Sequence, residues 1–186
     1  MAIKIEHRIG VAAPVDDIYE LLEDINAWPE WSPIHKAALG ELHFGYPVHL
    51  EEYYEGLGTW EINGVVADWS PLSHIHIDVP KPFYAGKLIR YFEMDALSDQ
   101  GSTFTVGALF SGFLSEREGK QYRQFLRKGF EAFAEAVKAK SEARFAAGHN
   151  SRRTHMPIKE PEKPKLGPER PVWNKSQFLF FPKKKR

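Results

Sequence analysis

The chain has 186 residues, its 25 lysines and arginines are balanced by 25 aspartates and glutamates, and it contains no cysteine. The lack of cysteine excludes disulfides, thiolate metal sites and cysteine nucleophiles. No segment approaches the roughly 20 apolar residues of a membrane span, and the charged start "MAIKIEHRIG" is unlike a signal peptide, so we expect a cytoplasmic protein.

The zero net charge conceals two oppositely charged parts of the chain. Residues 149–186 hold 11 basic and three acidic residues, whereas residues 1–148 hold 14 basic and 22 acidic residues. We therefore expect one acidic folded domain over residues 1–148 and a basic, proline-rich segment over residues 149–186. The acidic balance of the domain argues against nucleic-acid binding by its surface.

The first predicted elements are a strand and two short helical pieces. Apolar and charged residues alternate in "IKIEHRIGV" (residues 3–11), which predicts a strand. "APVDDIYELLEDI" (residues 13–25) has a proline near its start, acidic residues in its first turn and one apolar face, which is typical of a short helix. "NAWPEWSPIH" (residues 26–35) keeps a three-residue apolar spacing around two prolines, so we expect a broken, apolar helical connection.

Strand-like segments follow as far as residue 114. "PVHLEEYYE", "TWEINGVVADW", "LSHIHIDV", "AGKLIRYFEMDAL" and "STFTVGALFSGFL" have a period of two and are separated by turns rich in glycine and proline. With a shorter strand near Ala37, they predict about six antiparallel strands joined as hairpins.

The last predicted element is a long amphipathic helix from Ser115 to Ala147. Its apolar residues recur at spacings of three and four, and no proline interrupts it. Ser115 with Glu118 fits a capping box at the start, and Gly148 fits a stop at the end. The predicted fold class is therefore α+β, with a curved antiparallel sheet of about seven strands, two short helices after the first strand, and a long C-terminal helix packed on the sheet.

The stretch "IEHRIGVAAPVDDIYELLEDINAWPEWSP" resembles the opening of the START-like (SRPBCC) superfamily of polyketide cyclases, dehydrases and lipid-transport proteins. The order of the later elements fits that superfamily through about Ala147. The resemblance implies a helix-grip fold, in which the sheet and short helices clasp the long helix and leave a cavity between them. It says little about chemistry, because the superfamily contains binders, transfer proteins, cyclases and co-chaperones.

The cavity implied by the resemblance would be lined by aromatic and apolar residues of the strands and the long helix. Trp28 and Trp31 lie in the linker between the short helices, where they either contact a ligand as part of a gate or hold the linker on the sheet. The same lining residues would also suit an ordinary filled core. The predicted lining comprises Trp28, Trp31, Trp60, Ile62, Phe92, Met94, Phe104, Val106, Ala108, Phe110, Tyr122, Phe125, Leu126 and Phe133.

Three polar residues fall on predicted inward faces. Glu52 and Tyr54 share a face with Val48 and Leu50, and Arg90 is on the apolar face of its own segment. A buried charge is rarely tolerated alone, so we expect Arg90 to pair with Glu52. The pair and Tyr54 are then candidates to orient the polar end of a ligand, to act as general acid and base, or to form a structural bridge at the cavity mouth.

Other chemistry-bearing motifs are weak. "SHIHID" puts His74, His76 and Asp78 on one strand face, but its isoleucines form the natural core face, so we expect solvated histidines rather than a metal site or a catalytic histidine. The sequence contains no nucleophile motif, phosphate-binding glycine loop or dinucleotide fingerprint. We therefore assign no catalytic residue, metal or cofactor from the sequence.

The segment 149–186 has many prolines and almost no periodicity, so we expect it to be extended or disordered. Its "VWNKSQFLFF" would suit docking on the domain, a membrane or a partner, and its end "PKKKR" has the form of a nuclear import signal, relevant only in a eukaryote. A basic solubilising end is the simpler interpretation.

Together these features predict a protein that binds, and in one version transports, a small hydrophobic ligand such as a lipid, polyketide or aromatic compound. The first alternative is an enzyme resembling polyketide cyclases and dehydratases, which would use the same polar residues as acid and base. The second alternative is a protein-interaction module resembling co-chaperones, which would act through its surface and the segment 149–186. The sequence leaves the oligomeric state open.

Overall fold

The computed structural model describes residues 2–148, so every prediction for the segment 149–186 lies outside the described residues. The elements, in chain order, are β1 (Ala2–Val11), α1 (Val15–Glu23), the 3-10 helix η1 (Ile25–Ala27), α2 (Trp28–Trp31), β2 (His35–Gly40), β3 (Pro47–Tyr54), β4 (Gly58–Ser70), β5 (His74–Val79), β6 (Lys87–Ser98), β7 (Gly101–Ser111) and α3 (Phe113–Ala146). The predicted α+β helix-grip architecture is confirmed.

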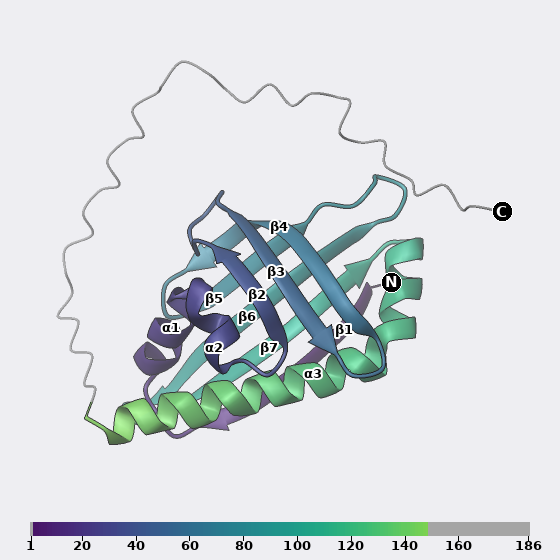
Figure 1. Cartoon of the computed structure of the whole chain (residues 1–186). Coiled ribbons are helices and arrows are strands. Elements are labelled where there is room, and N and C mark those ends of the chain that lie inside the picture. Colours follow the sequence, from purple (N-terminus) through teal and green to yellow (C-terminus); the bar gives the residue numbers. More distant parts are fainter. Residues whose placement is uncertain (1, 149–186) are drawn as a thin grey trace, which may run out of the picture. The chain divides into compact units, whose positions relative to one another are not determined.

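The seven strands form one antiparallel sheet in the order β1-β7-β6-β5-β4-β3-β2. Strands β2 to β7 are paired with their neighbours in sequence, while β1 pairs with β7 along its whole length from Ala2 to Val11. The long helix α3 crosses one side of this sheet, and α1 and α2 lie beside it (Figure 1). The short helices and α3 therefore cover the same face, and the core lies between that face and α3.

At the β2 edge of the sheet, a side chain satisfies backbone groups that a further strand would otherwise bind. The Asn26 amide nitrogen donates to the Gly40 carbonyl at 3.3 Å, and the Gly40 N–H donates to the Asn26 side-chain oxygen at 3.4 Å. Asn26 lies in η1, which packs against β2. The connection between the short helices thus protects part of an open sheet edge.

Helix α3 begins earlier than the capping-box prediction placed it. The helix starts at Phe113, after Gly112 with a φ of 89°, and Ser115 is a buried helical residue whose hydroxyl donates to the Lys87 carbonyl at 2.8 Å. The capping box was wrong because the chain reverses at Gly112, where only glycine adopts this φ without strain. The stop at Gly148 is confirmed, since its φ is 73° and its N–H donates to the Phe145 carbonyl at 3.0 Å.

The core lies between the concave face of the sheet and α3, as the alternation in the strands predicted. Val48 and Leu50 of β3 are buried, and Phe104, Val106 and Phe110 of β7 are fully buried. On β5, Ile75 and Ile77 are fully buried while the histidines beside them are partly exposed. The predicted orientation of the "SHIHID" segment is therefore confirmed.

Candidate functional site

A buried polar cluster lies on the inner face of the sheet, centred on Glu52 of β3 and Arg90 of β6. Their side chains are fully buried, and Arg90 Nη2 donates to Glu52 Oε1 at 2.7 Å. Two strands separate β3 from β6 in the sheet, and neighbouring strands lie about 4.8 Å apart. Curvature of the sheet and the length of the arginine side chain together make this contact possible. The predicted pairing is confirmed, although the pair lies in the interior and not at a mouth.

Aromatic rings and a backbone carbonyl hold the Arg90 guanidinium in place. Its Nη1 donates to the Gly107 carbonyl of β7 at 2.7 Å, and the group lies 4.4 Å from the ring centre of Phe130 on α3 and 5.5 Å from that of Phe92. Such cation–π contacts are strongest where water is excluded. Among residues 2–148, Arg90 Nε has no hydrogen-bond partner although it is buried. One donor of the guanidinium is therefore available for another acceptor.

Tyr54 binds the second oxygen of the Glu52 carboxylate. Its hydroxyl donates to Glu52 Oε2 at 2.6 Å, and its ring passes close to α3 at Gly129. A β-carbon at position 129 would come within 2.2 Å of the Tyr54 ring, so the missing side chain makes room for it. A glycine in the middle of a helix costs about 1 kcal/mol relative to alanine. We attribute Gly129 to this close approach.

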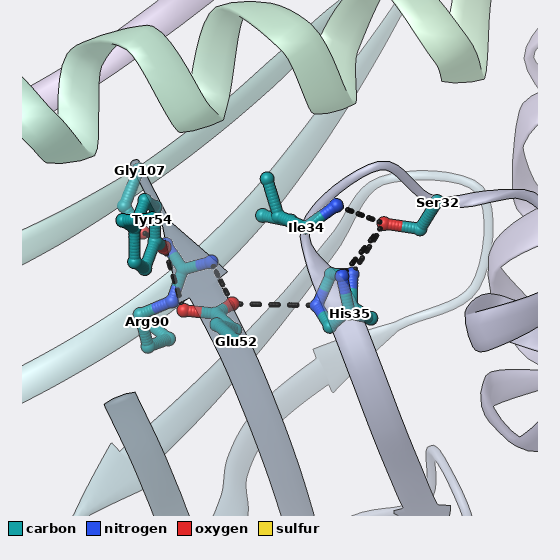
Figure 2. A network of polar contacts seen from close by, with 7 residues as sticks. All are labelled: Ser32, Ile34, His35, Glu52, Tyr54, Arg90 and Gly107. Atoms are coloured by element: carbon teal, nitrogen blue, oxygen red, sulfur yellow. Dashed lines mark hydrogen bonds and ion pairs between the residues drawn. The ribbon is translucent and has the colours of Figure 1, made fainter. Parts of the chain in front are cut away.

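His35 and Ser32 extend the cluster toward the short helices (Figure 2). The backbone N–H groups of Ile34 and His35 both donate to Ser32 Oγ, at 3.4 and 3.3 Å, which leaves the serine hydroxyl to donate to His35 Nδ1 at 2.6 Å. His35 Nε2 then carries the proton and faces Glu52 Oε1 at 3.3 Å. The cluster superficially resembles a Ser-His-Glu triad. However, Ser32 is buried and both lone pairs of its oxygen accept from backbone N–H groups, so it is not a nucleophile.

The pKa shifts in the cluster follow from burial opposed by pairing. Burial raises the pKa of Glu52, but Arg90, His35 and Tyr54 outweigh burial and lower it to about 2. Burial lowers the pKa of His35, only partly offset by its contact with Glu52. Burial and the neighbouring carboxylate raise the pKa of Tyr54 well above its usual value. Near neutral pH the cluster therefore holds an ionised Glu52–Arg90 pair, a neutral histidine and a neutral phenol.

The predicted lining residues fall into two groups. Ten are buried with at most 2 % of their surface exposed, namely Trp28, Ile62, Phe92, Met94, Phe104, Val106, Ala108, Phe110, Leu126 and Phe133. Four are partly exposed, namely Trp31 on α2, Trp60 on β4, and Tyr122 and Phe125 on α3. Trp28 packs edge-on against His35, with ring centres 4.8 Å apart, and donates its indole N–H to the Leu22 carbonyl at 3.1 Å.

Sequence reasoning missed His35, Ser32 and the Gly107 carbonyl as parts of the cluster. The pairing of β2 with β3 is irregular between His35 and Ala37, so residues 35 and 38, and not alternate residues, point inward. A bulge of this kind shifts the alternation of side chains, so a period of two no longer predicts which residues point inward. A usable signal was Ser32 three residues before His35, a spacing that allows a side-chain contact across a turn.

A pocket of about 480 Å³ lies elsewhere on the domain and contains none of the predicted lining residues. It is lined by Asp78, Val79, Pro80, Lys81, Phe83, Gly86, Lys87, Ser111 and Gly112. These residues surround the β5–β6 loop and the turn before α3. No pattern in the sequence indicated this pocket.

The described residues add two observations about other classes of site. Within residues 2–148, no group of three or more histidines and acidic residues is arranged to hold a metal ion. No helix in that range combines the length and apolar character needed to cross a bilayer.

The comparisons with known proteins agree with this architecture. The family model for "Polyketide cyclase / dehydrase and lipid transport" matches residues 2–142. The chain belongs to this family. The matched range includes all seven strands, the short helices and most of α3. No curated protein matches the sequence.

Solved structures with the same fold include several aromatase/cyclases. The chain is similar to the di-domain ARO/CYC StfQ from the steffimycin biosynthetic pathway (16 % identity, TM-score 0.62), covering 78 % of this chain and 52 % of StfQ, so it spans about half of that protein. It is similar to the Zhui aromatase/cyclase from Streptomyces sp. R1128 (20 % identity, TM-score 0.60; 80 % and 99 % covered). It is also similar to a START superfamily protein from Mycobacterium smegmatis (17 % identity, TM-score 0.59; 75 % and 97 % covered). At these identities the likeness shows the fold alone.

Proposed function

We propose that the protein binds one small, largely apolar ligand between the curved sheet and α3, and that the buried cluster receives a hydrogen-bond-accepting group of that ligand. The observation that carries the proposal is the free, buried Nε donor of Arg90 beside Glu52, whose two oxygens already accept from Arg90 and Tyr54. Because Glu52 and Arg90 neutralise each other, the cluster suits a neutral acceptor such as a ketone or amide carbonyl better than a carboxylate.

The energetic cost of the cluster supports a role beyond the fold. Removing two charges from water costs several kcal/mol per ion, and a buried ion pair is often no more stabilising than apolar residues of the same volume. Here the pair is fully buried among the aromatic rings of Phe92 and Phe130. An apolar cluster would serve the core equally well, so we attribute the polar one to ligand recognition.

The protonation states of the cluster favour binding over acid–base catalysis. A carboxylate with a pKa of about 2 is a weak base, and a phenol with a strongly raised pKa is a weak acid. The unprotonated nitrogen of His35 is occupied by the Ser32 hydroxyl at 2.6 Å. These groups are fixed donors and acceptors, which position a ligand without exchanging protons with it.

The partly exposed aromatic residues suit the apolar part of the ligand. Trp60 of β4 lies 6.2 Å from Tyr54 between ring centres, so it connects the surface with the cluster. Phe125 of α3 lies against Gly56 in the β3–β4 turn, on the side where α3 meets β3 only lightly. A ligand entering there would exchange water for apolar surface at about 25 cal/mol per Å².

Native mass spectrometry of the freshly purified full chain, followed by organic extraction, tests whether a ligand accompanies the protein. We expect a stoichiometric mass above 21.3 kDa that extraction removes. An apo mass that no apolar compound shifts would contradict the proposal.

A matched pair of probes tests the role of the cluster. Tryptophan fluorescence would follow titration with 2-acetylnaphthalene, which has a carbonyl, and with 2-ethylnaphthalene, which has none. A hydrogen bond to a charged group contributes about 1.5–3 kcal/mol, so we expect the ketone to bind at least about tenfold tighter. Ala108→Met should weaken both probes by filling the interior, whereas Leu109→Met on the other face of β7 should affect neither. Equal binding of the two probes would contradict recognition by the cluster.

A further inference from the structure

Four large apolar side chains are exposed together at one corner of the domain, which we call the aromatic corner. They are Phe83 and Tyr84 of the β5–β6 loop, exposed by 98 % and 61 %, and Phe113 and Leu114 at the start of α3, exposed by 81 % and 42 %. Exposed apolar residues are ordinary when scattered, but a contiguous group marks an interaction surface. None of these residues belongs to the proposed ligand site.

Backbone contacts hold the two parts of the aromatic corner together. The Ser115 N–H of α3 donates to the Ala85 carbonyl of the loop at 2.9 Å, and the Ser115 hydroxyl donates to the Lys87 carbonyl at 2.8 Å. Gly86 and Gly112, both with positive φ, lie against each other so closely that a β-carbon on Gly112 would meet the Gly86 Cα at 2.7 Å. The loop and the helix start are therefore held against each other, and both carry exposed apolar side chains at this crossing.

Between Phe113 and Lys128 the exposed face of α3 is basic, and the exposed Glu131 ends this face three residues later. At 3.6 residues per turn, Phe113, Arg117, Lys120, Gln124, Arg127 and Lys128 fall within an arc of about 100° on the helix. Arg117, Lys120, Arg127 and Lys128 are all exposed, and no acidic residue lies between Gly119 and Phe130 in the sequence. We call these four residues the basic face. It contrasts with the domain as a whole, which has 22 acidic and 14 basic residues.

We propose that the aromatic corner and the basic face form one surface that docks on an anionic lipid bilayer. Apolar and aromatic side chains insert into the boundary between headgroups and acyl chains, while lysines and arginines attract anionic headgroups. The basic face extends about 17 Å from Arg117 to Lys128 along α3 at 1.5 Å per residue, with the aromatic corner at one end. The pocket beside Phe83 is lined by Lys81 and Lys87 together with one acidic residue, Asp78.

The shape of the corner favours a lipid surface over a folded protein partner. Phe83 borders the pocket described above, yet it is almost entirely exposed, so its ring protrudes from the surface. A fluid bilayer accommodates such a protruding ring without matching its shape. The charge complementarity of the basic face then supplies attraction for anionic lipids. This inference concerns a surface outside the ligand site, so it does not rest on the proposed function.

Sedimentation of the full chain with vesicles tests the proposal. The probes are vesicles of phosphatidylcholine with about a third of phosphatidylserine, and vesicles of phosphatidylcholine alone. Each basic residue near an anionic surface contributes about fivefold in binding, so Lys120→Gln/Arg127→Gln should weaken binding to the anionic vesicles at least tenfold. Lys36→Gln/Lys140→Gln removes the same charge from exposed positions outside the surface and should change binding less than twofold. All variants retain residues 149–186, so any contribution of that basic segment is constant.

The aromatic corner is tested separately with Phe83→Ser/Phe113→Ser, against Leu39→Ser/Phe44→Ser as a control with similarly exposed side chains. We expect the first pair of substitutions to lower anionic-vesicle binding at least tenfold and the second pair to leave it unchanged. Equal binding by all variants, or equal binding to both kinds of vesicle, would overturn the proposal. Binding to polyglutamate that needs the basic face but not Phe83 and Phe113 would also overturn it, in favour of an acidic protein partner.

Discussion

Two clusters of histidines and carboxylates lie on opposite faces of the same sheet, and burial makes them chemically different. On the inner face, His35, Glu52 and Arg90 are fully buried. On the outer face, His74 Nε2 lies 3.2 Å from Asp68 and His76 Nε2 lies 3.6 Å from Glu93, with all four side chains accessible to solvent. The same residue types thus form a desolvated, fixed network on one face and a hydrated set of surface contacts on the other.

This contrast shows that burial determines how much a polar contact contributes to stability. The pKa of Glu52 is lowered to about 2 by partners that must outweigh a large cost of burial. The pKa of Asp68 is also lowered, first by its hydrogen bond with His74, but this carboxylate is exposed to water. Water and salt screen contacts of the second kind, so they contribute little to stability. Substitutions in the two clusters should therefore differ strongly in effect.

The largest expected effect comes from removing one partner of the inner pair. Glu52→Ala leaves the Arg90 charge buried and unpaired, which costs about 3–5 kcal/mol of the free energy of unfolding. Glu51→Ala, one residue away on the other face of β3, should change that free energy by no more than about 0.5 kcal/mol. Urea denaturation of both variants measures the difference. Similar losses of unfolding free energy in both variants would show that the inner cluster contributes no more to stability than a surface residue does.

Lowering the pH should reduce the free energy of unfolding by a comparable amount. The lowered pKa of Glu52 means that its contribution, about 3 kcal/mol, is complete above its unfolded value of 4.5 and is lost as the pH falls toward 2. His35, with its lowered pKa, acts in the same direction and begins to reduce stability below 6.5. The stability difference between wild type and Glu52→Gln should therefore shrink as the pH falls from 4.5 to 2. A difference that does not vary with pH would contradict the ionised, paired state of Glu52.

A smaller effect is expected where α3 approaches the inner cluster. Gly129→Ala would place a β-carbon within 2.2 Å of the Tyr54 ring, and overpacking of this kind costs about 1–3 kcal/mol. Without that contact the substitution would stabilise the helix by about 1 kcal/mol. The sign of the change in thermal unfolding decides between these outcomes. If the close approach is the cause, the Gly129→Ala substitution should be tolerated once Tyr54→Leu has removed the ring.

The smallest effect is expected on the outer face. His74→Gln and His76→Gln each remove a partly exposed contact, and such substitutions usually change the free energy of unfolding by no more than about 0.5 kcal/mol. Chemical denaturation near neutral pH checks this expectation. A loss of several kcal/mol would mean that the outer cluster contributes as much as the inner one.

Much of the fold and part of the site follow from the sequence. Alternation alone placed Glu52, Tyr54 and Arg90 on inward faces, because successive side chains of a regular strand point to opposite sides of the sheet. The need to pair a buried charge then joined Arg90 to Glu52. Both inferences depend only on local geometry and on the cost of burying a charge.

The remaining features depend on geometry that alternation does not describe. The irregular pairing after His35 turned that residue inward, out of step with its strand. The Gly107 carbonyl on the neighbouring strand β7 and the Phe130 ring on α3 both contact the Arg90 guanidinium. The aromatic corner joins Phe83 and Phe113, which are distant in sequence, through two glycines at a close crossing. No periodic pattern records such tertiary contacts.

The most direct measurement uses an apolar replacement of the inner cluster, Glu52→Leu/Tyr54→Phe/Arg90→Met. Its free energy of unfolding and its affinities for 2-acetylnaphthalene and 2-ethylnaphthalene would be compared with those of wild type. If the cluster serves a ligand, stability should be unchanged or higher by about 1–4 kcal/mol while the preference for the ketone disappears. A variant that loses several kcal/mol of stability and still prefers the ketone as wild type does would show that the cluster serves the fold and not the ligand.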